Sequence, residues 1–218
     1  MNRTPIQDSI RLRGHSVWLP RSFVNRDPRK VARELLGKLI VRKCGRKTIA
    51  GRIVEVEAYL GQNDLAAHAA AGRTARNQVL FGPPGHAYVY FIYGMYFCLN
   101  ISCQPEGQPG CVLIRALEPV SGIEQMAEAR GLLENIGLDF SRPANLRRLT
   151  SGPGRLCEAL GITRDRDNGK DLLSSGSDLH VLDDGYRAAK IVASPRIGIT
   201  KSAELALRYV IAGNEFIS

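Results

Sequence analysis

The run Glu55-Val-Glu57-Ala-Tyr59 combines side chains that are suited to acid–base chemistry. It closes a stretch over residues 48–59 that favours a β-strand, on which side chains two apart share a face. Glu55, Glu57 and Tyr59 should therefore point the same way. Two carboxylates beside an aromatic ring could form a general-base site next to a stacking surface. The alternative is the solvated face of a half-buried sheet, where most charged residues lie.

Asp64 and His68 follow this strand after the loop Gly61-Gln62-Asn63. If the segment is helical, residues four apart share a face and the two side chains lie together. A zinc site needs more ligands than these, and the sequence has no H-x-x-x-H pattern and no cysteine cluster. We therefore expect no metal here, and we expect His68 to hydrogen-bond to a substrate or a phosphate.

Arg115 interrupts the apolar run Cys111–Leu117, which predicts a short strand. A buried arginine must be paired with an acceptor. Either it is the structural partner of an acid such as Glu118, or it is a functional cation beside the face that carries Glu57. The local pattern leaves both possibilities open.

A third candidate is Ser151-Gly-Pro-Gly-Arg155, at the start of a predicted short helix that Gly161 closes. Free main-chain N–H groups at a helix start can bind an anion. Ser151, Gly152 and Arg155 are therefore candidates for contact with phosphate. The alternative is that Gly-Pro simply turns the chain.

Aromatic residues concentrate between Phe81 and Phe97, which hold seven of the fourteen in the chain. The segment 88–102 predicts a β-hairpin that breaks at Tyr93-Gly94. Such a hairpin could be an aromatic core element, or it could stack on flat ligands such as nucleic-acid bases. Phe91, Ile92 and Phe97 are the expected core members.

The remaining patterns predict a single mixed α+β domain with a mainly antiparallel curved sheet, surrounding helices and a protruding β-hairpin. We expect a flexible basic segment over residues 1–18 and the folded domain over residues 19–218. The expected elements are a helix from Asp27-Pro28 to Leu36, strands at 38–43 and 207–212, a helix from a Ser121-Gly-Ile-Glu124 capping box to Leu133, and a hairpin at Asp184-Gly185 joining strands 179–182 and 187–193.

The charge and composition narrow the class of partner. The net charge is +9, and residues 1–50 hold 13 Lys and Arg against 3 Asp and Glu. This favours an anionic partner, with solubility as the alternative explanation. The five cysteines contain no C-x-x-C pair, and no signal peptide or membrane-spanning run is present, so we expect a reduced cytoplasmic protein with buried Cys98 and Cys111 thiols. The P-loop, G-x-S-x-G and G-x-G-x-x-G motifs are also absent.

Several long blocks, in order, resemble the alkyladenine (3-methyladenine) DNA glycosylase family from about Leu19 to the end of the sequence. The blocks are Arg52-Ile-Val-Glu-Val-Glu-Ala-Tyr-Leu-Gly61, Asp64-Leu-Ala-Ala-His68, Tyr88-Val-Tyr-Phe-Ile-Tyr-Gly-Met-Tyr-Phe-Cys-Leu-Asn100, Val112-Leu-Ile-Arg-Ala-Leu-Glu-Pro119, Ser151-Gly-Pro-Gly-Arg-Leu-Cys157 and Arg196-Ile-Gly-Ile199. Three segments depart from the family pattern and bear on lesion range rather than on the reaction: Gln104–Gly110, Ala69–Asn77 and Lys201.

The resemblance implies a monofunctional enzyme that flips a damaged purine out of double-stranded DNA and hydrolyses its N-glycosidic bond, which starts base excision repair. The implied lesions are 3-methyladenine, 7-methylguanine, hypoxanthine and ethenoadenine. By analogy, Glu57 activates the attacking water and Arg115 helps to hold it. The implied roles of the other residues are a base pocket of Tyr59, His68, Tyr90, Asn100, Leu113 and Ile197, and a wedge, Tyr93, that fills the gap in the DNA stack.

The resemblance also implies no metal or organic cofactor, and we expect a monomer that is associated with the nucleoid in a bacterium. Two other functions compete with this one. A damage sensor would bind flipped bases without excising them. A nucleoside hydrolase would act on small substrates, although a wedge tyrosine and a basic N-terminal segment would have no purpose there.

Overall fold

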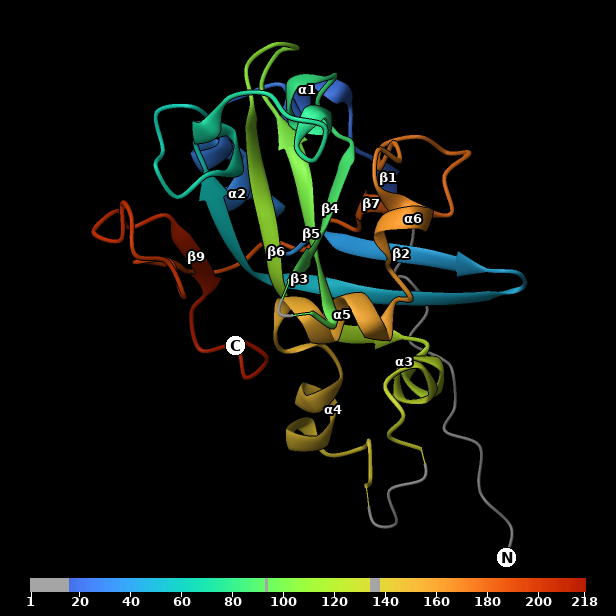
Figure 1. The fold of residues 1–218 in the computed structure, drawn as a ribbon. Coiled ribbons are helices and arrows are strands. Elements are labelled where there is room, and N and C mark those ends of the chain that lie inside the picture. The colour runs from blue at the N-terminus through green and yellow to red at the C-terminus, as the bar shows by residue number, and fades with distance from the viewer. Residues whose placement is uncertain (1–15, 93, 134–137) are drawn as a thin grey trace, which may run out of the picture.

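A computed structural model describes residues 16–92, 94–133 and 138–218 of the chain (Figure 1). Tyr93 and most of the predicted flexible segment 1–18 therefore lie outside the described residues. Val17 and Trp18, the last two residues of that predicted segment, pair with residues 182–183 of a later strand. No helix among the described ranges is long and apolar enough to cross a membrane.

The fold is α+β, as predicted, and every strand pair in its sheet is antiparallel. The main order of strands is β1-β7-β2-β3-β6-β5-β4, and β9 pairs with both β3 and β8. The strands are β1 (Val17–Trp18), β2 (Leu39–Cys44), β3 (Lys47–Tyr59), β4 (Ala87–Ile92), β5 (Tyr96–Cys103), β6 (Gly110–Ser121), β7 (Leu179–Asp183), β8 (Ile191–Ser194) and β9 (Arg208–Ile211).

Short helices surround the sheet. In Figure 1 the β2–β3 hairpin runs across the view while β4, β5 and β6 rise steeply from it, and α3, α4 and α5 gather below. The helices are α1 (Arg21–Val24), α2 (Pro28–Leu35), α3 (Ile123–Ala129), α4 (Pro143–Thr150), α5 (Pro153–Ala159), α6 (Arg164–Asp167) and the 3₁₀ turns η1 (His68–Ala71) and η2 (Gln78–Phe81).

Helix α2 forms as its sequence predicts. The Asp27 side chain accepts a hydrogen bond from the Arg29 main-chain N–H at 2.8 Å, and Pro28 occupies the first helical position. Val31 and Leu35 share one face and are fully buried. They join the main core with side chains from α5 and the sheet, among them Ile53, Leu99, Ile114 and Leu156.

Two local predictions are wrong because tertiary contacts override them. The hairpin predicted at Asp184-Gly185 does not form: β7 pairs with β1 and β2, while β8 pairs with β9. The Asp184 carboxylate instead accepts from Arg52 at 2.8 Å, which ties this turn to β3. The capping box at Ser121 also fails, since the Ser121 hydroxyl donates to the carbonyl of Thr48 and Gly122 occupies the N-cap.

The structure corrects two further expectations. Helix α3 ends at Ala129 rather than near Leu133, and a further helix that the sequence patterns do not predict, α4, precedes α5. Phe91, predicted to be a core residue, is 46% exposed and leans against Phe97 with ring centroids 5.1 Å apart. Strand alternation puts Phe91 on the same side of β4 as the buried Val89, so the exposure comes from its position near the outer end of the β4–β5 hairpin, where burial decreases along the strand.

Candidate active site

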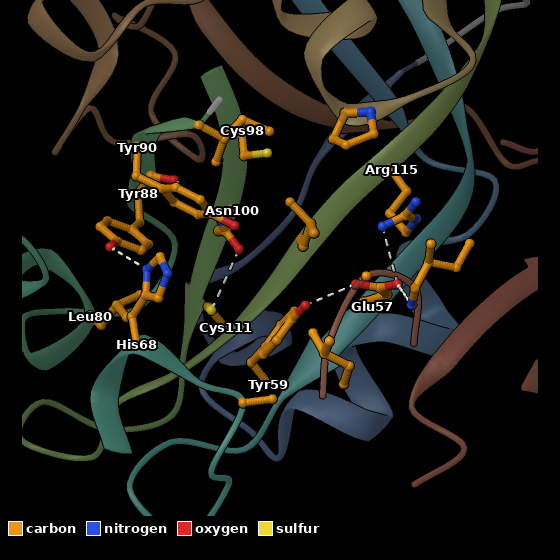
Figure 2. A pocket seen from close by; sticks show the side chains of 17 residues that line it. Glu57, Tyr59, His68, Leu80, Tyr88, Tyr90, Cys98, Asn100, Cys111 and Arg115 are labelled. Atoms are coloured by element: carbon orange, nitrogen blue, oxygen red, sulfur yellow. Dashed lines mark hydrogen bonds and ion pairs between the residues drawn. The ribbon is translucent and has the colours of Figure 1, made fainter. Parts of the chain in front are cut away.

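A cavity of about 440 Å³ opens over the sheet where β3, β4, β5 and β6 lie side by side. One row of directly opposed residues crosses all four strands in the order Tyr88, Asn100, Leu113 and Glu57. Figure 2 shows aromatic side chains at one end of the cavity and Glu57 with Arg115 at the other. The sheet register therefore brings residues from distant parts of the sequence into one site.

Glu57 has no exposed surface, but it borders the cavity. Its Oε2 accepts a hydrogen bond from the Tyr59 hydroxyl at 2.9 Å, and its Oε1 accepts from the main-chain N–H of Ile197 at 2.8 Å. Arg115 Nη1 lies 3.2 Å from the same Oε1. The two hydrogen bonds and the ion pair hold the carboxylate in one orientation, and a buried carboxylate of this kind requires such partners.

The predicted alternation of β3 is confirmed, and the solvated-face alternative is wrong. Glu55 and Glu57 both reach Arg115, and Tyr59 reaches Glu57, so the three side chains share one side of the strand. Glu55 and Glu57 are fully buried. They are covered because β9 pairs along this half of β3, and because the loop that contains Ile197 folds over the site.

Arg115 owes its direction to an irregularity in the β3–β6 ladder. Glu55 faces Ala116 and Val56 faces Ile114, which leaves Arg115 without a cross-strand partner. Bulges of this kind redirect side chains beside active sites. Arg115 Nε donates to Glu55 at 2.9 Å, so its partners are Glu55 and Glu57 rather than Glu118, which accepts from Asn214.

The aromatic end of the cavity is built from His68, Tyr88 and Tyr90. The ring centroids of His68 and Tyr90 are 4.5 Å apart, and those of Tyr88 and Tyr90 are 5.3 Å apart. His68 Nδ1 lies 2.8 Å from the Tyr88 hydroxyl. Burial, helped by the charge of Arg76, lowers the pKa of His68, and burial raises the pKa of Tyr88 to about 12. The wall therefore presents uncharged rings at neutral pH.

Asn100 places a polar side chain in the floor of the cavity, between Tyr88 and Leu113 of this row. Asn100 is buried and donates from Nδ2 to the carbonyl of Tyr88 at 3.2 Å, while its Oδ1 accepts from the Cys111 thiol at 3.7 Å. Burial raises the pKa of Cys98 to about 11 and that of Cys111 to about 12, so both are neutral thiols as expected. All five cysteines are free.

Comparisons with known proteins agree with this geometry. The family model for methylpurine-DNA glycosylase matches residues 22–215. The chain belongs to the methylpurine-DNA glycosylase family. It is accordingly a DNA glycosylase, a hydrolase of N-glycosyl bonds that acts in DNA repair, and its substrate is DNA.

Three relatives are similar along nearly their whole length, and each carries the name "Putative 3-methyladenine DNA glycosylase". The protein of Koribacter versatilis (strain Ellin345) is 62% identical over 200 residues, which cover 92% of each chain. That of Methanocella arvoryzae is 50% identical over 190 residues, 87% of this chain and 88% of the relative. That of Clostridium acetobutylicum is 44% identical over 204 residues, 92% and 97% of the two chains.

In this glycosylase, Asp64 and His68 are not arranged as predicted. Asp64 does not face His68, because the segment between them is a turn that leads into η1. Asp64 instead binds Arg196, and no local pattern in the sequence predicts this pair. Among the residues that the structure describes, no group of three or more His, Cys, Asp or Glu could hold a metal ion.

The candidate phosphate contacts are also partly engaged within the protein. The Gly152 main-chain N–H donates to the carbonyl of Arg115 at 3.1 Å, and the Ser151 hydroxyl donates to the carbonyl of Ile217 at 3.1 Å. Both groups are therefore used in the fold, and the predicted free N–H at Gly152 is wrong. Arg155 is exposed at the start of α5 and stays a candidate for contact with DNA.

Proposed function

We propose that this DNA glycosylase removes alkylated purines of the 3-methyladenine type from duplex DNA, using a water that Glu57 activates. The supporting observation is that a buried carboxylate, held by fixed donors, stands at the end of an aromatic cavity. The names of the relatives support this class of lesion. We extend the proposal to 7-methylguanine, hypoxanthine and ethenoadenine, which are of similar shape.

The cavity suits a flat base that has left the DNA stack. Its volume of about 440 Å³ falls within the range of small-molecule sites. The base would lie between Tyr59 on one side and His68 and Tyr90 on the other, above Asn100. Stacking on these rings would help to offset the few kcal/mol that unstacking costs. We propose that Tyr93, between β4 and β5, fills the gap left in the duplex.

The contacts of Glu57 leave room for one more donor. An ionised carboxylate offers about four acceptor positions. Hydrogen bonds from Tyr59 and Ile197 occupy two of them, one on each oxygen, and Arg115 forms an ion pair with the Oε1 that Ile197 binds. A water at the open position on Oε2 could give its proton to Glu57 and attack the sugar carbon as the purine leaves, and the negative charge of Glu57 would stabilise an oxocarbenium-like state. An alkylated purine is cationic and already a good leaving group.

Substitution of Glu57 by Gln tests the proposal, since it keeps the shape of the side chain and removes the carboxylate that would accept the proton of the water. We expect unchanged binding of a lesion-containing duplex and a fall in single-turnover release of the purine by about 100- to 10,000-fold. Glu118→Gln is the matched control, because Glu118 lies outside the cavity and bonds to Asn214. If the Glu57→Gln enzyme released purine at the wild-type rate, Glu57 would be ruled out as the general base. Separate duplexes with each lesion would measure the substrate range.

A further inference from the structure

Glu55 is a second fully buried carboxylate beside the site, and the cavity does not expose it. Its Oε1 accepts from Arg115 Nε at 2.9 Å and from Arg208 Nε at 2.7 Å. Its Oε2 accepts from the main-chain N–H of Ser218 at 2.5 Å. Burial alone would raise the pKa of Glu55, but the bonds from Ser218 and Arg208 hold that pKa below its usual range. Glu55 is therefore an ionised anchor.

Ser218 closes a ring of contacts around Arg115. Arg115 Nη2 donates to the Ser218 hydroxyl at 3.3 Å, and that hydroxyl lies 3.0 Å from Glu55 Oε1. Arg115 Nε donates directly to the same carboxylate oxygen. Two nitrogens of the guanidinium, Nε and Nη2, are thus bound to Glu55 and Ser218. Only Nη1 is directed to Glu57, at 3.2 Å.

The segment that carries Ser218 is itself fixed. The carbonyl of Ile217 accepts from Arg147 Nη2 at 2.8 Å and from the Ser151 hydroxyl at 3.1 Å, and Phe216 is buried in the main core. In Figure 1 this end of the chain lies between β9 and α4. The Ser218 side chain is exposed at its surface, whereas the groups it binds are buried. The fold therefore delivers Ser218 to the Glu55 carboxylate.

We propose that Glu55 and Ser218 are positioning residues for catalysis, which hold Arg115 so that a single nitrogen, Nη1, pairs with Glu57. This inference rests on the proposed function of Glu57. A guanidinium prefers to bind a carboxylate through two parallel N–H groups. If Glu55 or Ser218 released Arg115, the guanidinium could turn and bind Glu57 in that way. It would then take the acceptor position that the attacking water needs.

The test compares point variants in two measurements: single-turnover release of purine from an alkylated duplex at saturating enzyme, and the dissociation constant for that duplex. Ser218→Ala removes the hydroxyl at an exposed position where folding should be unaffected. We expect release to fall about tenfold, the effect of one charge-assisted hydrogen bond. Ser218→Thr keeps the hydroxyl and should restore the rate. Glu55→Gln should slow release by on the order of 100-fold.

In each case the dissociation constant should stay within about twofold, because neither group faces the bound base. Thr150→Val is the matched structural control: it removes a buried hydroxyl that donates to the carbonyl of Leu117 at 2.6 Å. It should lower the melting temperature without changing release. The release rate of Glu55→Gln is interpreted only if this variant folds. If it does not fold, the comparison of Ser218→Ala with Ser218→Thr decides the test.

A wild-type rate of purine release by Ser218→Ala would overturn the inference. A reduced rate in Ser218→Ala that is equally reduced in Ser218→Thr would also overturn it. Glu57→Gln, run in the same assay, separates the two levels of the proposal. If Glu57→Gln is inactive while Ser218→Ala is fully active, only the positioning role fails. If Glu57→Gln is itself active, the proposed function fails as well.

Discussion

The Arg196 guanidinium donates to both carboxylate oxygens of Asp64, at 2.5 and 2.8 Å, and neither side chain has exposed surface. Arg196 also donates to the carbonyl of Ala58 and stacks on the ring of Tyr59 at 4.6 Å. The next residue, Ile197, gives its main-chain N–H to Glu57. The pair therefore fixes two of the donors that orient the Glu57 carboxylate.

Breaking this pair should be costly. Burial would raise the pKa of Asp64, but hydrogen bonds from Arg196 and from the Leu60 main-chain N–H hold that pKa below its usual range. Asp64→Asn leaves Arg196 buried without a counter-charge, so we expect a loss of about 3–5 kcal/mol in the free energy of unfolding. Urea denaturation measures it. Glu34→Gln is the control, since Arg26 binds Glu34 through the same two-bond geometry at the surface. There we expect about 1 kcal/mol or less.

A double substitution separates stability from activity. Asp64→Leu with Arg196→Met replaces the pair by apolar side chains, which commonly restores stability. We expect the double variant to unfold at a urea concentration near that of the wild type and yet to release purine more slowly. If the double variant released purine at the wild-type rate, the loop around Ile197 would need no ion pair to reach Glu57.

Stability should depend on pH through His180, which is buried, and His68, which lines the cavity. Burial lowers the pKa of both His68 and His180 from the ordinary value of 6.5. The unfolded chain therefore takes up protons first as the pH falls, which favours unfolding. Their contribution is complete above about pH 6.5 and is lost progressively from there towards the lowered pKa values of the folded state.

Melting temperatures at about pH 8 and about pH 5.5 measure this effect. Each of His68→Gln and His180→Gln should reduce the difference between the two temperatures, and the double variant should reduce it further. His86→Gln is the comparison, since this side chain lies at the surface against the carbonyl of Pro83. An unchanged difference in the double variant would contradict the assignment to these two residues.

Binding to DNA should depend steeply on salt. Each phosphate contact contributes about 0.9 to the slope of log affinity against log salt. Residues 1–15 contain Arg3, Arg11 and Arg13, so a chain that begins at Ser16 should show a smaller slope. Residue 16 is the better starting point than residue 19, because Val17 and Trp18 pair with β7. Equal slopes for the two chains would show that residues 1–15 make no phosphate contact.

Much of the site could be predicted from local sequence. Strand alternation placed Glu55, Glu57 and Tyr59 on one side of β3, and the aromatic run predicted the β4–β5 hairpin. Both patterns depend on neighbours within a few residues, where backbone geometry fixes the direction of each side chain. The resemblance of the long sequence blocks then identified the family.

Local patterns could not decide which distant groups meet. The contacts from Glu55 to Ser218 and from Asp64 to Arg196 join residues 163 and 132 positions apart. The hairpin signal at Asp184-Gly185 failed for the same reason, because β7 found its partners in β1 and β2.

The sequence by itself thus determined the residue types, the strand faces and the reaction class. Only the tertiary structure decided that Arg115 pairs with Glu55 as well as Glu57, and that Ile197 and Ser218 supply main-chain donors. The physical reason is that any residue can offer a main-chain N–H, so its partner is set by the packing of the whole chain and leaves no trace in the side-chain pattern.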